Sequence, residues 1–170
     1  ITNCSYTGTL NGYQYCGGIA GYLSKGTVSN CYNAGTIYAA SKNAGGIVGS
    51  GAPVNIIGCY NIGAVTAKDS YAGGIVSNDT TGTISNCFNA GAVSGADYAG
   101  AIAGNVSKAT AVLAHNYYLE GTNAKGIGVT KGDHTVEAVS AETLASAEFV
   151  ATVNAELETP AYVKGENYPV

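Results

Sequence analysis

The sequence predicts an all-β protein, a parallel β-solenoid (β-helix-like) of about 28-residue coils with a small C-terminal α/β cap. Two interleaved internal repeats and an unusual composition lead to this prediction. Only 11% of the 170 residues are charged, and 25 are Gly. An average soluble domain is about 25% charged and about 7% Gly. The composition therefore favours many tight turns around a repetitive apolar core.

The first repeat is a ten-residue block. Its copies are ITNCSYTGTL (1–10), VSNCYNAGTI (28–37), IIGCYNIGAV (56–65), ISNCFNAGAV (84–93) and a weaker LAHNYYLEGT (113–122). The second repeat reads GGIAG (17–21), GGIVG (45–49), GGIVS (73–77) and GAIAG (100–104). Because the two stay in phase over four periods, each period is one structural unit that stacks on the next.

The composition of the repeats selects β-strands. Gly, Asn, Thr, Val and Tyr dominate them, and these residues disfavour helix interiors. Leu is too scarce for a leucine-rich repeat. Short β-branched and aromatic runs between Gly, Asn and Ser are typical of short strands joined by turns. Coils of such strands, stacked in parallel, place the same repeat position about 4.8 Å higher on each rung.

Like side chains should therefore form rows along the stack. We expect three aliphatic rows to fill the interior: Ile1, Val28, Ile56, Ile84 and Leu113; Leu10, Ile37, Val65 and Val93; and Ile19, Ile47, Ile75 and Ile102. At one turn the glycines Gly35, Gly63 and Gly91 recur, where we expect positive φ angles. Just before it, Asn33, Asn61 and Asn89 are placed to form an amide ladder.

Two parts of the chain differ in composition. Residues 1–118 are predicted to form the solenoid, and residues 119–170, which are rich in Glu, a C-terminal cap that closes the last coil. The cap should contain one short helix over about 140–154, with Ser140 as its N-cap. An open solenoid end exposes strand edges. We therefore expect further coils or another cap before residue 1.

Four cysteines occupy one repeat position and are predicted to form a structural ladder: Cys4, Cys31, Cys59 and Cys87. Buried free thiols behave as small hydrophobic groups. The sequence has no C-x-x-C pair, and thiols in a straight row do not give the tetrahedral ligands of zinc. We expect neither a metal site nor a complete set of disulfides, since the cysteines number five.

The next repeat position carries aromatic residues: Tyr32, Tyr60, Phe88 and Tyr117, with Ser5 in the first copy. If the cysteines face inward, strand alternation turns these rings outward, as an exposed aromatic strip. One interpretation is that the rings only stabilise the rungs by stacking. The other is a ligand-binding platform for sugar rings or a partner protein, because aromatic residues are enriched at recognition surfaces.

No catalytic, cofactor-binding or metal-binding residue is predicted. His115 stands at an Asn position of the repeat, and His134 follows Asp133 in a turn, but no hydrolase, zinc-protease or phosphate-loop motif is present. The chain has a net charge of −4 and no Arg, which argues against nucleic-acid binding. It has no run of about 20 apolar residues, so we expect no membrane insertion.

The two repeats resemble the GLUG-motif repeats of bacterial surface and secreted proteins. Gly18-Ile19-Ala20-Gly21 and Gly46-Ile47-Val48-Gly49 carry the motif, whereas Ser77 and Ala101 depart from it in later copies. The resemblance implies an extracellular or cell-surface location, host or microbial glycans or a surface protein as partners, and a larger parent chain with other domains. It implies a non-catalytic module that acts in adhesion or as a spacer. The alternatives are an accessory module of a surface peptidase or glycosidase, or a self-assembling fibre subunit.

Overall fold

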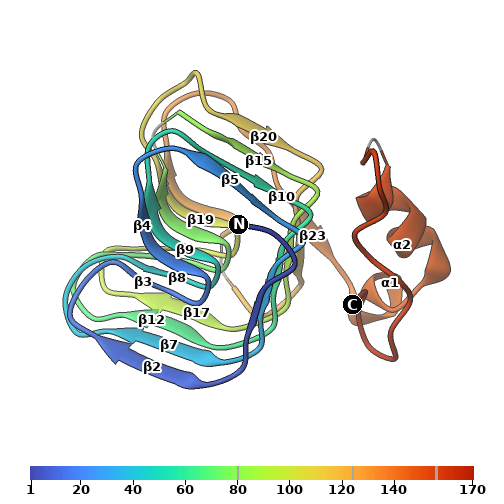
Figure 1. Cartoon of the computed structure of the whole chain (residues 1–170), viewed down its shortest axis with the longest axis horizontal. Helices are drawn as coiled ribbons and strands as arrows, with labels where there is room; N and C mark the ends of the chain where they lie inside the picture. Colours follow the sequence, from blue (N-terminus) through green and yellow to red (C-terminus); the bar gives the residue numbers. More distant parts are fainter. Residues whose placement is uncertain (80, 124, 156) are drawn as a thin grey trace.

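The computed structural model describes the whole chain except residues 80, 124 and 156, with the backbone alone at residue 79. The described chain is a parallel β-solenoid of about four coils with a small helical part at its C-terminal end, as predicted. Figure 1 looks along the stack and shows the coils superposed, with the helices beside them. No described helix is long and apolar enough to cross a membrane.

Five parallel sheets run along the stack, and each takes one strand from each successive coil. We name the first the aromatic sheet; it contains β1 (Ser5–Tyr6), β6 (Tyr32–Asn33), β11 (Tyr60–Asn61), β16 (Phe88–Asn89), β21 (Tyr117–Leu119) and β23 (Glu137–Val139). The second contains β2 (Thr9–Gly12), β7 (Thr36–Ala39), β12 (Val65–Ala67) and β17 (Val93–Gly95). The third contains β3 (Cys16–Gly17), β8 (Ala44–Gly45), β13 (Tyr71–Gly73) and β18 (Tyr98–Gly100). The fourth contains β4 (Ala20–Leu23), β9 (Val48–Gly51), β14 (Val76–Asp79), β19 (Ala103–Val106) and β22 (Ile127–Thr130), and the fifth β5 (Gly26–Ser29), β10 (Val54–Ile57), β15 (Thr83–Ser85) and β20 (Val112–Ala114).

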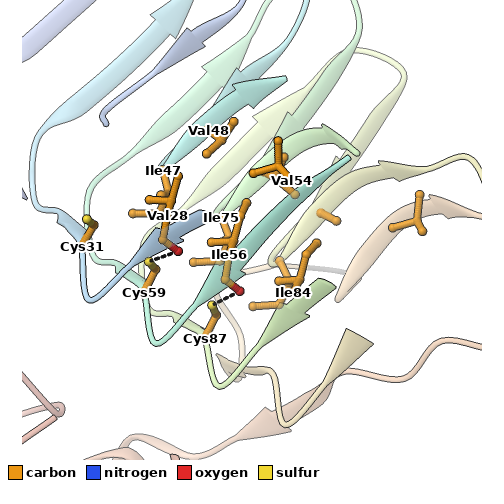
Figure 2. Packing of buried hydrophobic residues seen from close by; sticks show 14 of the residues in the cluster. Val28, Cys31, Ile47, Val48, Val54, Ile56, Cys59, Ile75, Ile84 and Cys87 are labelled. Atoms are coloured by element: carbon orange, nitrogen blue, oxygen red, sulfur yellow. Dashed lines mark hydrogen bonds between the residues drawn. The ribbon is translucent and has the colours of Figure 1, made fainter. Parts of the chain in front are cut away.

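The pairing register reproduces the sequence repeat. Tyr60 pairs with Tyr32 on one side and with Phe88 on the other, so equivalent residues lie directly above one another. The aliphatic rows fill the interior, where the side chains of Ile47, Ile75 and Ile102 are fully buried, but the expectation is wrong for Ile1, which is exposed. Figure 2 shows this packing, with Val28, Ile56 and Ile84 from the fifth sheet facing the isoleucine row. Stacking thus supplies the core that a single coil lacks.

The predicted amide ladder is present and fully buried. The Asn33 Nδ2 donates to Asn61 Oδ1 at 2.7 Å, and the Asn61 Nδ2 donates to Asn89 Oδ1 at 2.7 Å. Each of the three amides also donates to the carbonyl oxygen two residues further on, as Asn61 does to Gly63 at 2.9 Å. The ladder satisfies amide groups that would otherwise be costly to bury.

The expectation of positive φ at Gly35, Gly63 and Gly91 is wrong, because none of the three is among the positive-φ glycines. Close backbone approach explains them instead. A Cβ on Gly63 would overlap the carbonyl oxygen of Gly35 on the neighbouring coil, and one on Gly91 would overlap that of Gly63. These positions are glycine because the coils pack too closely for a side chain.

The C-terminal part differs from the expected cap in three ways. Strands β22 and β23 still pair within the solenoid sheets, so the pairing continues past the predicted boundary at residue 118. Two helices replace the single one: α1 (Ala141–Leu144) and α2 (Ala147–Asn154). Ser146 has an extended backbone and its hydroxyl caps α2 by accepting from Phe149 N, which ends α1 and starts a new helix. The helices and the tail that follows pack against the side of the solenoid, on the aromatic sheet, and not over the last coil (Figure 1).

Candidate binding surface

Three of the four aromatic residues predicted at one repeat position, Tyr32, Tyr60 and Phe88, form a stacked ladder on the outer side of the aromatic sheet. The rings of Tyr32 and Tyr60 lie 4.9 Å apart with an interplanar angle of 8°. Those of Tyr60 and Phe88 lie 5.0 Å apart at 2°. The ring separation follows the rise between rungs, which is the spacing of hydrogen-bonded strands. The stacking interpretation of this row is therefore supported by its geometry.

The expected exposure of this strip is wrong for three of its four rings. Tyr60 and Tyr117 are each 7% exposed, and Phe88 is fully buried. Phe149 of α2 makes edge-on ring contacts to Phe88 at 6.3 Å and to Tyr117 at 5.1 Å, and the ring of Tyr162 lies 6.0 Å from that of Tyr60. Strand alternation correctly turned the rings away from the solenoid interior, but a second hydrophobic cluster forms outside it, between the aromatic sheet and the C-terminal segment.

Polar contacts fasten this C-terminal segment to the solenoid. The buried Tyr162 hydroxyl lies 2.8 Å from the carbonyl oxygen of Asn86 and 3.1 Å from that of Cys59. In the other direction, the Asn86 amide donates to the carbonyl oxygens of Val153 at 3.0 Å and Ala155 at 2.7 Å. Burial raises the pKa of the Tyr162 hydroxyl well above its ordinary value. The segment is thus docked by specific hydrogen bonds and not only by apolar contact.

Tyr32 is the remaining ring, and it is half-buried at the N-terminal end of the ladder. Its register partner on the first coil is the exposed Ser5, so the paired position, within the described residues, supplies no ring to stack on it. A cavity of about 320 Å³ is lined by Ser5 and Tyr32 together with Asn3, Cys4, Asn30, Pro160 and Ala161. A second cavity of about 450 Å³ is also lined by Tyr32 and Asn30 and reaches Thr7 and Tyr168. The two share Tyr32, Asn30 and Ala161; we call them together the Tyr32 cleft.

The cysteine row is a ladder of free thiols in the structure, but only partly a buried one. Cys31, Cys59 and Cys87 are buried, whereas Cys4 on the first coil is exposed. The Cys59 thiol lies 3.7 Å from the carbonyl oxygen of Val28 on the preceding coil (Figure 2). Burial raises the pKa of the Cys59 thiol well above its ordinary value. Buried protonated thiols of this kind are inert packing groups.

The two histidines that the sequence analysis considered lie in different surroundings. The ring of His134 contacts its own turn, with Nε2 3.1 Å from the carbonyl oxygen of Lys131. His115 lines a cavity of about 360 Å³ with Glu137 and Tyr117, but the lining contains no Ser, no Cys and no second carboxylate. Among the described residues, no group of three or more His, Cys, Asp or Glu side chains is placed to hold a metal ion.

Sequence reasoning missed two features of this region. Asn116 stands at the cysteine position of the last block, where its amide donates to the Ile84 carbonyl at 2.7 Å and accepts from Cys87 N at 3.1 Å. The sequence analysis also did not predict the Tyr32 cleft, although the sequence shows the break in the aromatic row at Ser5. That break was the available signal, because an interrupted ladder leaves one ring face without a neighbour.

Comparisons with known proteins identify a solved structure that is similar to this chain. No protein-family model matches the chain, and no curated protein does either. The chain is similar to the crystal structure of a proposed immunoglobulin A1 protease from Bacteroides ovatus, with 29% sequence identity and a TM-score of 0.75. The similarity covers 99% of this chain and 56% of that protein, so the chain spans little more than half of its neighbour's length. Membership of the GLUG-motif family stays a prediction.

Proposed function

We propose that this chain is a non-catalytic scaffold module of a larger bacterial surface or secreted protein, in which it acts as a spacer. The observation that carries this proposal is that most ordered rows of side chains make contacts between successive coils. The isoleucine rows, the amide ladder and the thiol ladder hold one coil to the next. A continuous stack of this kind is a rigid element whose length grows by about 4.8 Å with each coil.

The comparison supports a place within a larger protein. The structural match takes in 99% of this chain but only 56% of the neighbouring protein. The substrate in that neighbour's description, an immunoglobulin, is an extracellular protein, which supports a surface or secreted location. In this setting the solenoid would hold other parts of its parent chain at a fixed separation. Accessory positioning of a peptidase or glycosidase, the alternative from the sequence, is a special case of the same role.

The proposal is tested first by a search for activity. The purified chain is incubated with immunoglobulin A1 and with casein, and the products are analysed by mass spectrometry. We expect no cleavage. Cleavage by the native chain would overturn the proposal. The double variant His115→Ala plus His134→Ala would then tell whether the activity depends on the two histidines or rests on carboxylates alone.

The spacer role is tested by removing one repeat. Deletion of residues 28–55 joins Thr27 to Ile56, which is the register partner of Val28. We expect a folded protein with one rung fewer, shorter by about 4.8 Å along the stack in small-angle scattering. Failure of this variant to fold would count against interchangeable coils. Sedimentation at high concentration tests the fibre alternative, for which a strict monomer would be the negative result.

A further inference from the structure

The aromatic ladder ends with an unused ring face. Tyr60 has a ring stacked on each of its faces, from Tyr32 and Phe88. Tyr32 has a stacked ring on one side only, because its partner on the first coil is Ser5. One cavity of the Tyr32 cleft is lined by both members of this register pair, Ser5 on the first coil and Tyr32 on the second. The fold therefore offers an aromatic platform with room above it for one further ring.

The lining of the Tyr32 cleft defines the chemistry of what fits. None of its side chains is charged, which disfavours a charged ligand. Its polar groups are the amides of Asn3 and Asn30, the hydroxyls of Ser5 and Thr7, and further the Cys4 thiol and the phenol groups of the lining tyrosines. These groups both donate and accept hydrogen bonds. A ring with one apolar face and a rim of hydroxyl groups meets both requirements, and pyranose sugars have this form.

The cleft also has a wall on the side away from the coils. Pro160 and Ala161 line one part of it and Tyr168 another, all from the tail after α2. The tail is held in place by the Asn154 side chain, which accepts from Ala161 N at 2.8 Å and from Tyr162 N at 3.0 Å. The cleft is therefore bounded by ordered elements on both sides, as preformed ligand sites are.

We propose that the Tyr32 cleft binds an uncharged sugar ring, stacked on the outer face of Tyr32. The apolar C–H face of the sugar would continue the ladder of Tyr60 and Tyr32, and its hydroxyl groups would meet Asn30 and Ser5 at the rim. This adds glycan recognition to the scaffold role and does not depend on it. The buried rings of Phe88 and Tyr117 take no part, in contrast to the strip predicted from the sequence.

The test uses one variant that removes the platform and one that fills the space above it. Tyr32→Ala takes away the stacking face. Ser5→Phe places a ring in the vacant ladder position while leaving Tyr32 intact, and Ser5 is exposed, so the variant should fold at least as stably as the native chain. The matched control is Tyr13→Ala, which removes a tyrosine that is 72% exposed and outside the cleft lining.

The native chain is first screened on an array of neutral host and bacterial glycans, and the affinity for the methyl glycoside of the best terminal sugar is then measured by NMR titration. We expect at least about tenfold weaker binding for both cleft variants and unchanged binding for the control. Melting temperatures establish that each variant is folded. Absence of any glycan binding, full binding by Ser5→Phe, or competition by aromatic peptides but not by sugars would each overturn the proposal. None of these results would bear on the separate test for peptidase activity.

Discussion

Substitution of Asn61 by Ala should cost about 3–4.5 kcal/mol of folding free energy, a large share of the ~5–15 kcal/mol typical of a domain. The Asn61 amide is fully buried and takes part in three hydrogen bonds. It donates to Asn89 Oδ1 at 2.7 Å and to the Gly63 carbonyl at 2.9 Å, and it accepts from Asn33 Nδ2 at 2.7 Å. Alanine leaves three buried partners unsatisfied, and each costs about 1–1.5 kcal/mol.

The assay is urea unfolding followed by tyrosine fluorescence and circular dichroism. The matched control is Asn105→Ala, which removes a similar amide contact, 2.9 Å to Asn78 Oδ1, at a half-buried position. Water can replace that hydrogen bond, so its loss should cost about 0.5–1 kcal/mol. If the two variants lose the same free energy, or if Asn61→Ala loses less than about 1 kcal/mol, the buried ladder is not what ties the coils together.

Three further predictions concern the cap, the thiols and the tyrosines. Gly58→Asn restores the residue found at this repeat position in neighbouring coils, but its Cβ would lie 2.9 Å from that of Ala161. We therefore expect faster amide hydrogen exchange in the C-terminal segment alone. An equal increase in exchange over the whole chain would contradict this. At pH 8 a thiol reagent should label Cys4 in the folded protein and all five cysteines only in urea, as read by mass spectrometry; rapid labelling of the buried thiols would be the contrary result. Burial raises the pKa of Tyr60 to about 12, above the value of about 10 in an unfolded chain. The folded state keeps this proton longer, so the contribution of Tyr60 to stability should be intact below about pH 10 and be lost towards pH 12, with the difference in urea midpoint between the native chain and Tyr60→Phe as the measurement.

The solenoid could be predicted from the sequence because each repeat position makes the same kind of contact in every coil, and the repeats therefore recur with the period of the coils. The structure adds the reason that they stay in phase. A Cβ on Gly46 would lie 2.7 Å from the side chain of Asn61, so the second glycine of one repeat packs against the amide of the other across the interior. The same contact joins Gly18 to Asn33. Inserting one residue between the motifs of a coil would separate these partners.

The exposed aromatic strip could not be excluded from the sequence, and the reason is general for repeat proteins. Alternation along a strand tells which side of its own sheet a residue such as Phe88 faces. It does not tell what lies beyond that side. The cover comes from Phe149 and Tyr162, which belong to a segment without a repeat, so no periodicity connects them to the ladder. The composition of residues 140–155 predicted helical structure there but not the face on which it docks.

The departures from the repeat are more informative about this surface than the repeat itself. Gly58 replaces the Asn of neighbouring coils where Ala161 of the tail comes close. Asn116 replaces the ladder cysteine in the fifth block, where its amide binds the backbone of the preceding coil. Ser5 interrupts the aromatic row beside a cavity. Each departure thus coincides with a local change in what the repeat position contacts: the tail at Gly58, the backbone of the preceding coil at Asn116 and a cavity at Ser5. These changes are visible in the sequence only as exceptions to the period, because the period itself reports the contacts that every coil shares.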